Sequence, residues 1–129
     1  MSKDYLLSML LALVCFSCDE DEEIARSLFE RGGGFFVVNE GAFQQGNGSF
    51  GFFNALSGEY EDAVFASQND LPLGDVVQSA LNIDDRIYIV VNNSNKIEIL
   101  EADSLKSTGR IEGLNSPRYM TQVLSLIHI

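Results

Sequence analysis

Short hydrophobic segments alternate with polar turns along the chain from residue 35 onward. The segments FFVV and IYIVV contain no polar residue, which is typical of strands covered on both faces of their sheet. The intervening turns are rich in Gly, Asn, Asp and Ser, which favour reversal of the chain. The pattern predicts an all-β protein. Its expected strands are Phe35–Glu40, Ser49–Asn54, Tyr60–Ala66, Val76–Ile83, Arg86–Asn92, Lys96–Glu101 and Lys106–Glu112.

Two stretches of the sequence repeat each other. FFVVNE (Phe35–Glu40) aligns with YIVVNN (Tyr88–Asn93) at an offset of 53 residues, and Ser49–Val64 aligns with Lys96–Ile111 at an offset of 47. A period of about 40–50 residues, built from short strands and polar turns, is typical of the blades of a β-propeller. The alternative is that two hairpins are similar by coincidence.

The repeat predicts four-stranded antiparallel blades, of which only about the first two are present. A blade cannot bury its own faces, and a closed ring needs roughly 4–8 blades. The second repeat contains all four strands, whereas the first contains three. Leu114–Met120 then occupies the place of Leu71–Val77, where a third blade would begin. We therefore expect an incomplete ring over residues 35–120, which does not form a stable monomer by itself.

The N-terminus carries the features of an export signal. Lys3 precedes the apolar run Tyr5–Phe16, which is too short to span a bilayer and fits a signal peptide. The run ends in CFSC, which resembles the lipobox of bacterial lipoproteins and implies that Cys18 is lipidated. The acidic run Asp19–Glu23 resembles the surface-export signal of Bacteroidota lipoproteins. A disulfide or metal pair with Cys15 is the alternative, but the chain has no further cysteine to complete a set of four ligands.

These features divide the chain into four parts. We expect a signal peptide at residues 1–17, an acidic tether at 18–34, the blades at 35–120 and a tail at 121–129. The end of the tail, Leu124–Ile129, fits no strand-and-turn pattern of the blades and resembles translated adapter sequence. We therefore expect the tail to be non-native.

Charge and composition exclude several classes of function. The net charge is −11, which disfavours nucleic acid and anionic membrane surfaces as partners. His128 is the only histidine and lies in the tail, so no histidine is available for acid–base catalysis or metal binding in the blades. No phosphate-binding loop occurs. We therefore expect a protein that is not an enzyme, with no metal and no cofactor.

The expected strand order places the longer loops on one face of the blades. These loops are Gly41–Gly48, Ser67–Asp75, Ser94–Asn95 and Gly113–Arg118. Long loops on a rigid scaffold are where function usually lies. The sequence therefore predicts a ligand-binding face with the candidate residues Glu40, Phe43, Leu73, Asp75, Asn93, Arg118 and Tyr119.

Local structural roles are the alternative for several of these residues. Asp75 follows Pro72-Leu73-Gly74, where a carboxylate commonly bonds nearby backbone, and this is the interpretation we favour for it. Asn39 and Asn92 share a repeat position at a strand end, which favours a bond from each side chain to the backbone. Arg118 and Tyr119 offer a planar donor beside an aromatic ring, suited either to a polar organic ligand or to a buried structural role.

The strings NEG, PLGDVVQS, YIVVNNSNKIEI and SPRYM together resemble the opening blades of the YncE-like seven-bladed propeller lipoproteins of the Bacteroidota. The resemblance covers Phe35–Met120. It implies a surface-exposed lipoprotein of the outer membrane, attached only through its lipid. Some members partner TonB-dependent transporters, and one branch captures cobalamin.

The resemblance implies capture of a small nutrient, with a corrinoid as one candidate, for a TonB-dependent transporter. A protein–protein or adhesion scaffold that uses the same face is the second hypothesis. A propeller enzyme is the third, and it would need catalytic residues in blades that this sequence does not contain.

Overall fold

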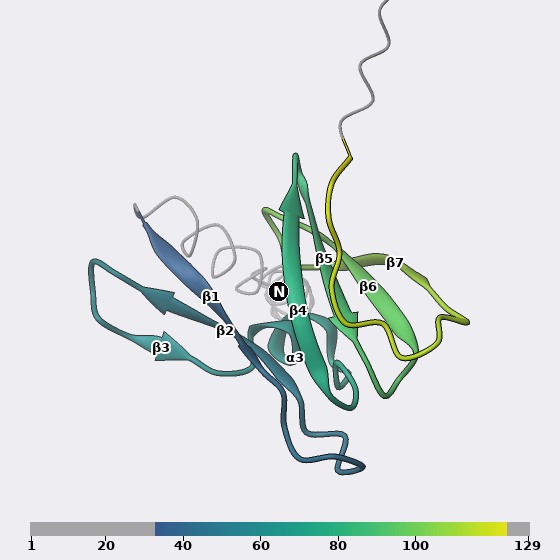
Figure 1. Cartoon of the computed structure of the whole chain (residues 1–129). Coiled ribbons are helices and arrows are strands. Elements are labelled where there is room, and N and C mark those ends of the chain that lie inside the picture. The colour runs from purple at the N-terminus through teal and green to yellow at the C-terminus, as the bar shows by residue number, and fades with distance from the viewer. Residues whose placement is uncertain (1–32, 124–129) are drawn as a thin grey trace, which may run out of the picture.

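The computed structural model describes residues 33–123, which form two antiparallel sheets and one short helix (Figure 1). The first sheet has the order β1-β2-β3 and the second has the order β4-β5-β6-β7. The elements are β1 (Gly34–Asn39), β2 (Ser49–Asn54), β3 (Tyr60–Glu61), α3 (Val64–Asn69), β4 (Val77–Ile83), β5 (Arg86–Val91), β6 (Lys96–Glu101) and β7 (Ser107–Ile111). The all-β fold is confirmed, with one partial and one complete four-stranded blade.

The predicted signal peptide, Cys18, most of the tether and the end of the tail lie outside the described residues. Within residues 33–123, no helix is long and apolar enough to cross a membrane.

The third strand is much shorter than predicted, because Val64–Ala66 belong to α3 and not to a strand. In α3 the side chains of Val64, Phe65 and Gln68 are buried, and the helix packs on β2. A helix of six residues is marginal by its own propensity, so this packing decides its conformation. The helix ends at Asp70, which adopts a left-handed conformation and donates its N–H to the carbonyl of Ala66 (3.0 Å).

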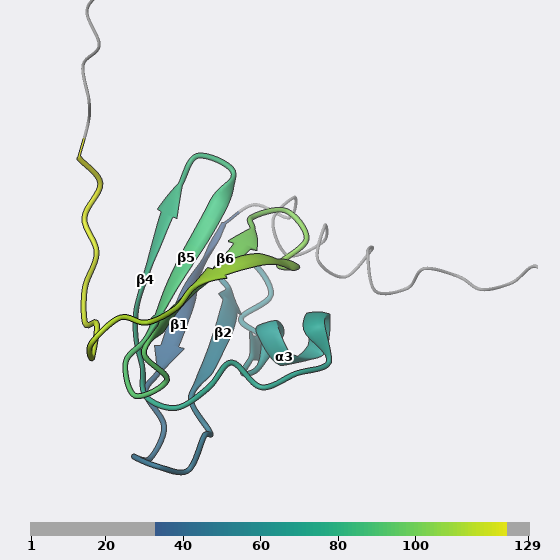
Figure 2. The same ribbon diagram turned by 90° about the vertical axis from the view of Figure 1, so that its right-hand side faces the viewer.

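The two sheets face each other, as Figures 1 and 2 show. The core lies between their facing sides. Cross-strand pairs such as Phe36 with Phe52 and Ile87 with Leu100 place apolar side chains on one face of each sheet. We call these the inner faces, and the opposite sides the outer faces. The core consists of Phe36, Val38, Phe50, Phe52, Val64, Phe65, Leu73, Val77, Ile87, Ile89, Val91, Leu100, Ala102 and Leu105.

A buried carboxylate lies on the inner face of the second sheet. Glu98 is 1% exposed and pairs across strands with Ile89. Its Oε2 contacts Nζ of Lys96 (2.7 Å), and its Oε1 accepts a hydrogen bond from Ser107 Oγ. Both carboxylate oxygens therefore have partners, as a buried charge requires.

The sequence repeat has a structural counterpart in two turns, the one between β2 and β3 and the one between β6 and β7. In the first sheet, the N–H of Gly58 donates to the carbonyl of Asn54 (2.9 Å). In the second sheet, the N–H of Leu105 donates to the carbonyl of Glu101 (2.9 Å). The two pairs are related by the predicted offset of 47 residues.

The predicted offset of 53 for the preceding strand is wrong by one residue. The N–H of Ala55 donates to the carbonyl of Gly33 (3.0 Å), and the N–H of Ala102 donates to the carbonyl of Asp85 (2.8 Å). Because Ala55 and Ala102 are equivalent, Gly33 is equivalent to Asp85, which gives an offset of 52. Side chains alternate along a strand, so a shift of one residue reverses the face to which each is assigned.

The shift separates Asn39 from Asn92, which were predicted to share a repeat position. Asn39 lies opposite Ser49 on the outer face of the first sheet, where its Nδ2 lies 2.8 Å from Asp62 Oδ1. Asn92 instead donates its Nδ2 to the carbonyl of Pro117 (2.8 Å). The two identical residues therefore have different roles.

Candidate functional site

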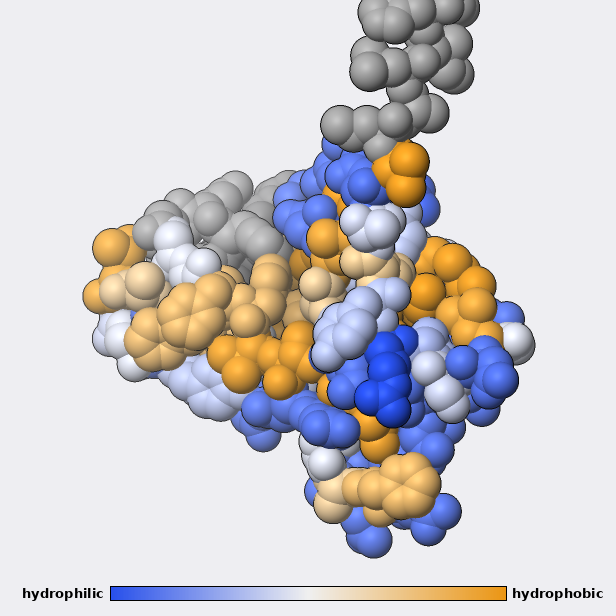
Figure 3. Space-filling model, viewed as in Figure 1, coloured by the Kyte–Doolittle hydropathy of each residue, from blue (hydrophilic) through white to orange (hydrophobic). Residues whose placement is uncertain are grey.

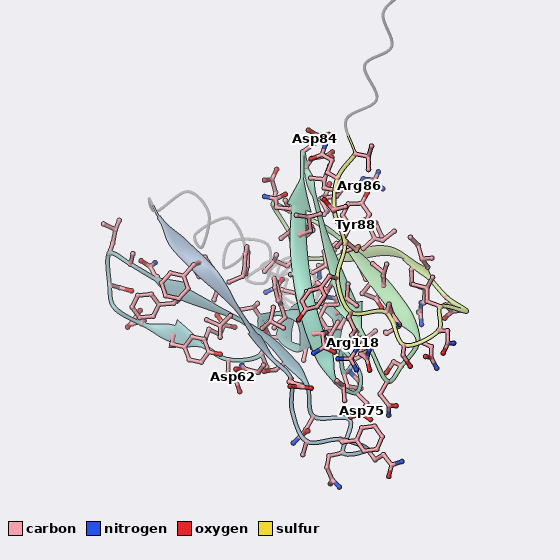
Figure 4. All side chains as sticks on the ribbon, in the orientation of Figure 1. Asp62, Asp75, Asp84, Arg86, Tyr88 and Arg118 are labelled. Atoms are coloured by element: carbon pink, nitrogen blue, oxygen red, sulfur yellow. The ribbon has the colours of Figure 1, made fainter. Side chains whose placement is uncertain are left out.

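The side chain of Asp75 joins the loops of the two blades on one face of the molecule (Figure 4). Its Oδ2 accepts hydrogen bonds from the N–H of Gln44 (2.9 Å) and from Nδ2 of Asn93, and its Oδ1 accepts one from the N–H of Gly46 (3.3 Å). Ser94 Oγ in turn accepts the N–H of Asp75 (3.0 Å). One carboxylate thus holds the β1–β2 loop, the linker before β4 and the β5–β6 turn together.

Asp75 is stabilised in its charged form by these donors. The hydrogen bond from Asn93 lowers the pKa of Asp75 below its ordinary value of 3.8, and the N–H groups of Gln44, Gly46 and Gln45 act in the same direction. Desolvation opposes them without reversing the direction. Asp75 therefore bonds backbone, but that of the distant β1–β2 loop and not of its own turn as the sequence interpretation expected.

The segment after β7 is attached to the same face by the β5–β6 turn. Asn95 accepts the N–H of Leu114 through its carbonyl (3.2 Å) and the N–H of Ser116 through its Oδ1 (3.1 Å). Ser79 Oγ donates to the carbonyl of Arg118 (2.8 Å). The hydrogen bonds thus link Gly41–Gly48, Ser94–Asn95 and Gly113–Arg118 with the end of the fourth predicted loop at Asp75, as expected for loops on one face. The start of that fourth loop was predicted wrongly, because Ser67–Asn69 belong to α3 and Asn69 bonds Leu105 in the β6–β7 turn.

Four of the predicted site residues are exposed on this loop face. Phe43 is 65% exposed, Tyr119 is 78% exposed, and Glu40 and Arg118 are also exposed. The side chains of Glu40 and Arg118 make no hydrogen bond or ion pair with the described residues. Figure 3 shows a hydrophobic area at the tip of the loop between β1 and β2, beside strongly hydrophilic surface. These four side chains therefore offer two aromatic rings, one cation and one anion to a partner.

The other three predicted site residues are engaged within the protein. Leu73 is buried in the core, so its assignment to a ligand-contacting surface is wrong. Asp75 and Asn93 bond each other, and their polar atoms hold loops in place. These two residues fix the positions of the loops that form the face.

The sequence reasoning missed a polar network on the outer face of the first sheet. Asp62 Oδ1 accepts hydrogen bonds from Ser49 Oγ (2.8 Å) and Tyr60 Oη (3.0 Å), and Asn39 Nδ2 lies 2.8 Å from Tyr60 Oη. Desolvation is the largest cause that raises the pKa of Tyr60. The predicted strand Tyr60–Ala66 includes Asp62, whereas in the structure Asp62 lies in the turn after β3, and this difference explains why the sequence does not predict the network.

The described part of the chain contains no group of three or more His, Cys, Asp or Glu residues that could hold a metal ion. The loop face combines aromatic and charged groups, which suits binding of an organic molecule or a protein.

The chain matches the model of a known protein family. Residues 33–124 match the family described as Domain of unknown function (DUF5074). The chain belongs to this family. The DUF5074 match covers both sheets and the segment after β7, so the loop face lies wholly within the family domain. No curated protein matches the chain.

Proposed function

We propose that this DUF5074 chain is the opening part of a surface-anchored binding propeller that captures a small nutrient for a TonB-dependent transporter. The observation that carries the proposal is the loop face, where Asp75 fixes three loops while Phe43, Arg118 and Tyr119 remain exposed around it. Fixed loops bind with a smaller loss of conformational entropy than mobile ones. A face of this construction suits capture and release without chemistry.

The exposed groups indicate the class of ligand. Aromatic rings offer stacking surface, and Arg118 offers planar donors for carbonyl or phosphate oxygens. Glu40 offers an acceptor for amide N–H groups. A corrinoid, which combines a large planar ring with peripheral amides and a phosphate, matches these three properties. The resemblance to YncE-like Bacteroidota lipoproteins supports the same class.

Calorimetric titration of the mature protein with cyanocobalamin tests the proposal. We expect binding heat at micromolar protein and a weaker affinity, by roughly tenfold, for Phe43→Ser. Leu56→Ser is the matched control, because Leu56 is equally solvent-exposed but lies in the β2–β3 turn on the opposite face. Absence of heat with the unmodified protein would refute the corrinoid assignment, and equal losses for both variants would refute the assignment of the loop face.

The anchor is a separate part of the proposal. We propose that Cys18 carries the lipid, that residues 1–17 are removed, and that the acidic run at 19–23 directs the protein to the outer surface of the outer membrane. Metabolic labelling with an alkyne fatty acid should mark the wild type and leave Cys18→Ser unmarked. Labelling of the variant would refute the anchor without touching the binding proposal.

A protein–protein scaffold is the second candidate function. The exposed Phe43 and Tyr119 favour it, since aromatic residues are enriched at protein interfaces. Capture of a transporter by the immobilised protein, equal in strength with and without cyanocobalamin, would favour the scaffold over nutrient capture.

A further inference from the structure

The backbone is strained where β4 begins. Among the residues that the structure describes, Val76 is the only β-branched residue with a positive φ (59°), and it directly precedes β4. The left-handed region is unfavourable for a branched side chain because its Cβ substituents crowd the backbone. Strain of this kind is concentrated at functional sites, where it holds a group in position for a ligand.

Hydrogen bonds to the β5–β6 turn maintain the strained conformation. Asp75 donates its N–H to Ser94 Oγ (3.0 Å), and its carbonyl accepts the N–H of Asn93 (3.2 Å). The carbonyl of Val76 accepts the N–H of Asn92 (2.8 Å). A strained backbone persists only where its surroundings fix it. The turn therefore determines the direction in which the chain enters β4.

A β-bulge follows the strained residue. Val77 lies opposite Val91. The next pair is Ser79 with Val90, so Gln78 has no partner in β5. Val77 belongs to the core, whereas Ser79 lies on the outer face of the second sheet together with Val90. Gln78 is the extra residue between the two faces, and a bulge of this kind redirects a side chain beside a functional site.

The amide group of Gln78 is accessible. The residue is half-buried, and within residues 33–123 its side chain makes no hydrogen bond. In the same part of the chain, the only polar side-chain atom that is fully buried without a partner is Oε1 of Gln68. The polar atoms of Gln78 therefore contact solvent. The bulge thus holds an acceptor oxygen and a donor N–H group at the surface.

Gln78 lies between two of the charged residues of the loop face, Glu40 and Arg118. The N–H of Val77 donates to the carbonyl of Glu40 (3.3 Å). Ser79 Oγ donates to the carbonyl of Arg118 (2.8 Å), and Figure 4 shows Arg118 beside the start of β4. The two sequence neighbours of Gln78 are therefore attached to these two residues. An anion, an amide and a cation follow one another across the start of β4.

We propose that Gln78 contacts the ligand of the loop face and recognises a carboxamide group on it. This inference rests on the proposed function, in which the loop face captures a small molecule. A primary carboxamide has an acceptor oxygen and an N–H donor on one edge, as the glutamine side chain has, so the two groups form a pair of hydrogen bonds. A ligand without the N–H leaves the oxygen of Gln78 without a donor, which lowers its affinity. Gln78 therefore contributes to specificity.

Titration of the isotopically labelled mature protein with nicotinamide, followed by nuclear magnetic resonance, tests the inference. Nicotinamide carries an aromatic ring and one primary carboxamide, so it presents the proposed group without the rest of a corrinoid. We expect the side-chain amide signals of Gln78 to shift at millimolar nicotinamide. N,N-dimethylnicotinamide keeps the ring and the carbonyl but has no N–H donor, so it should bind roughly fivefold more weakly. An unchanged Gln78 signal, or equal binding of the two probes, would overturn the inference.

Two variants separate the amide of Gln78 from the strand that carries it. Gln78→Ala removes the amide and should weaken nicotinamide binding by roughly fivefold, while the backbone signals of the core remain in place. Asn82→Ala is the matched control, because Asn82 is an exposed carboxamide near the other end of the same strand. The inference fails if Gln78→Ala binds nicotinamide like the parent, or if Asn82→Ala loses as much affinity.

Cyanocobalamin distinguishes failure of this inference from failure of the proposed function. If the parent and Gln78→Ala bind cyanocobalamin with the same affinity, the role of Gln78 is wrong and nutrient capture stands. If the parent gives no heat with cyanocobalamin but nicotinamide shifts the Gln78 signals, the corrinoid assignment is wrong and the role of Gln78 is supported.

Discussion

Asn93 donates a side-chain hydrogen bond to the carboxylate of Asp75, and this contact ties a turn of the second blade to the linker between the blades. The same carboxylate accepts two N–H groups from the loop of the first blade. A charged acceptor with several donors is stronger than a neutral one, so this residue is the main polar connection between the loops.

Replacement of Asp75 by Asn should loosen the loop face. The amide keeps the size of the side chain but presents one oxygen, so at least one of the N–H groups of Gln44 and Gly46 loses its acceptor. We expect the melting temperature to fall by a few degrees and hydrogen exchange at Gln44 and Gly46 to accelerate. Asp103→Asn is the control, because Asp103 is exposed in a turn on the opposite face and should melt like the parent. Unchanged exchange at Gln44 would contradict the role given to Asp75.

The contribution of Asp75 to the stability of the folded chain should decrease as the pH falls. Its pKa is lower in the folded protein than the ordinary 3.8 of the unfolded chain, so folding favours the charged form. The stabilisation is present above the unfolded value and is lost as the pH falls through the folded value. The difference in melting temperature between the parent and Asp75→Asn should therefore be constant from neutral pH to about 5 and shrink below about 4. A difference that grows on acidification would show that the carboxylate is not held in its charged form.

Gly51 is required by the close approach of β3 and the turn after it. A Cβ at this position would lie 2.5 Å from Tyr60 Oη, 2.7 Å from the carbonyl oxygen of Glu61 and 2.8 Å from that of Asp62. Two of these atoms are backbone, so relief requires the chain to move. We expect Gly51→Ala to lower the free energy of unfolding by about 1–3 kcal/mol in urea titrations at fixed protein concentration.

Gly109→Ala provides the matched comparison for this substitution. Gly109 also lies in a strand pairing, opposite Ile99, but a Cβ there would meet no atom within 4 Å. The change should be neutral or stabilise by a few tenths of a kcal/mol, because alanine restricts the unfolded chain. Equal losses for the two alanine variants would indicate a general cost of replacing glycine and not a steric clash at Gly51.

The sequence pattern was sufficient to predict six of the seven strands to within one residue, the blade repeat, and the common face of the β1–β2 loop, the β5–β6 turn and the segment after β7. Apolar runs, turn residues and the offset of 47 carry that information locally, as the equivalent bonds of Gly58 and Leu105 show. The helix at Val64 was not predictable in this way, because its packing on β2 overrides a weak local preference. The offset of 53 was wrong for a related reason: identical letters aligned Asn39 with Asn92, while the face of each residue is set by strand pairing.

The candidate site was predicted less completely than the fold. Glu40, Phe43, Arg118 and Tyr119 are exposed as a binding role requires, since polar or aromatic residues in long loops tend to reach the surface. Leu73 is buried because the linker before β4 folds back against the core. That distinction depends on which loop residues contact the core, and loop sequences do not encode this in a regular period.

The buried pair of Glu98 and Lys96 offers the most direct test of the packing between the blades. The side chain of Lys96 is 12% exposed, so Glu98→Ala would leave a cation without its partner in a largely buried position and would open a cavity beside Ile89. Breaking a buried pair from one side costs about 3–5 kcal/mol, so we expect this variant to be largely unfolded at room temperature by near-ultraviolet circular dichroism.

Glu98→Gln retains the volume and an acceptor for Ser107, so its loss of unfolding free energy should be clearly smaller. The double change Lys96→Met with Glu98→Leu removes both charges and fills the space, and we expect its free energy of unfolding to lie within about 2 kcal/mol of the parent. If Glu98→Ala unfolds no more readily than the double variant, Glu98 is not enclosed between the sheets, and the packing of the two blades against each other would have to be different.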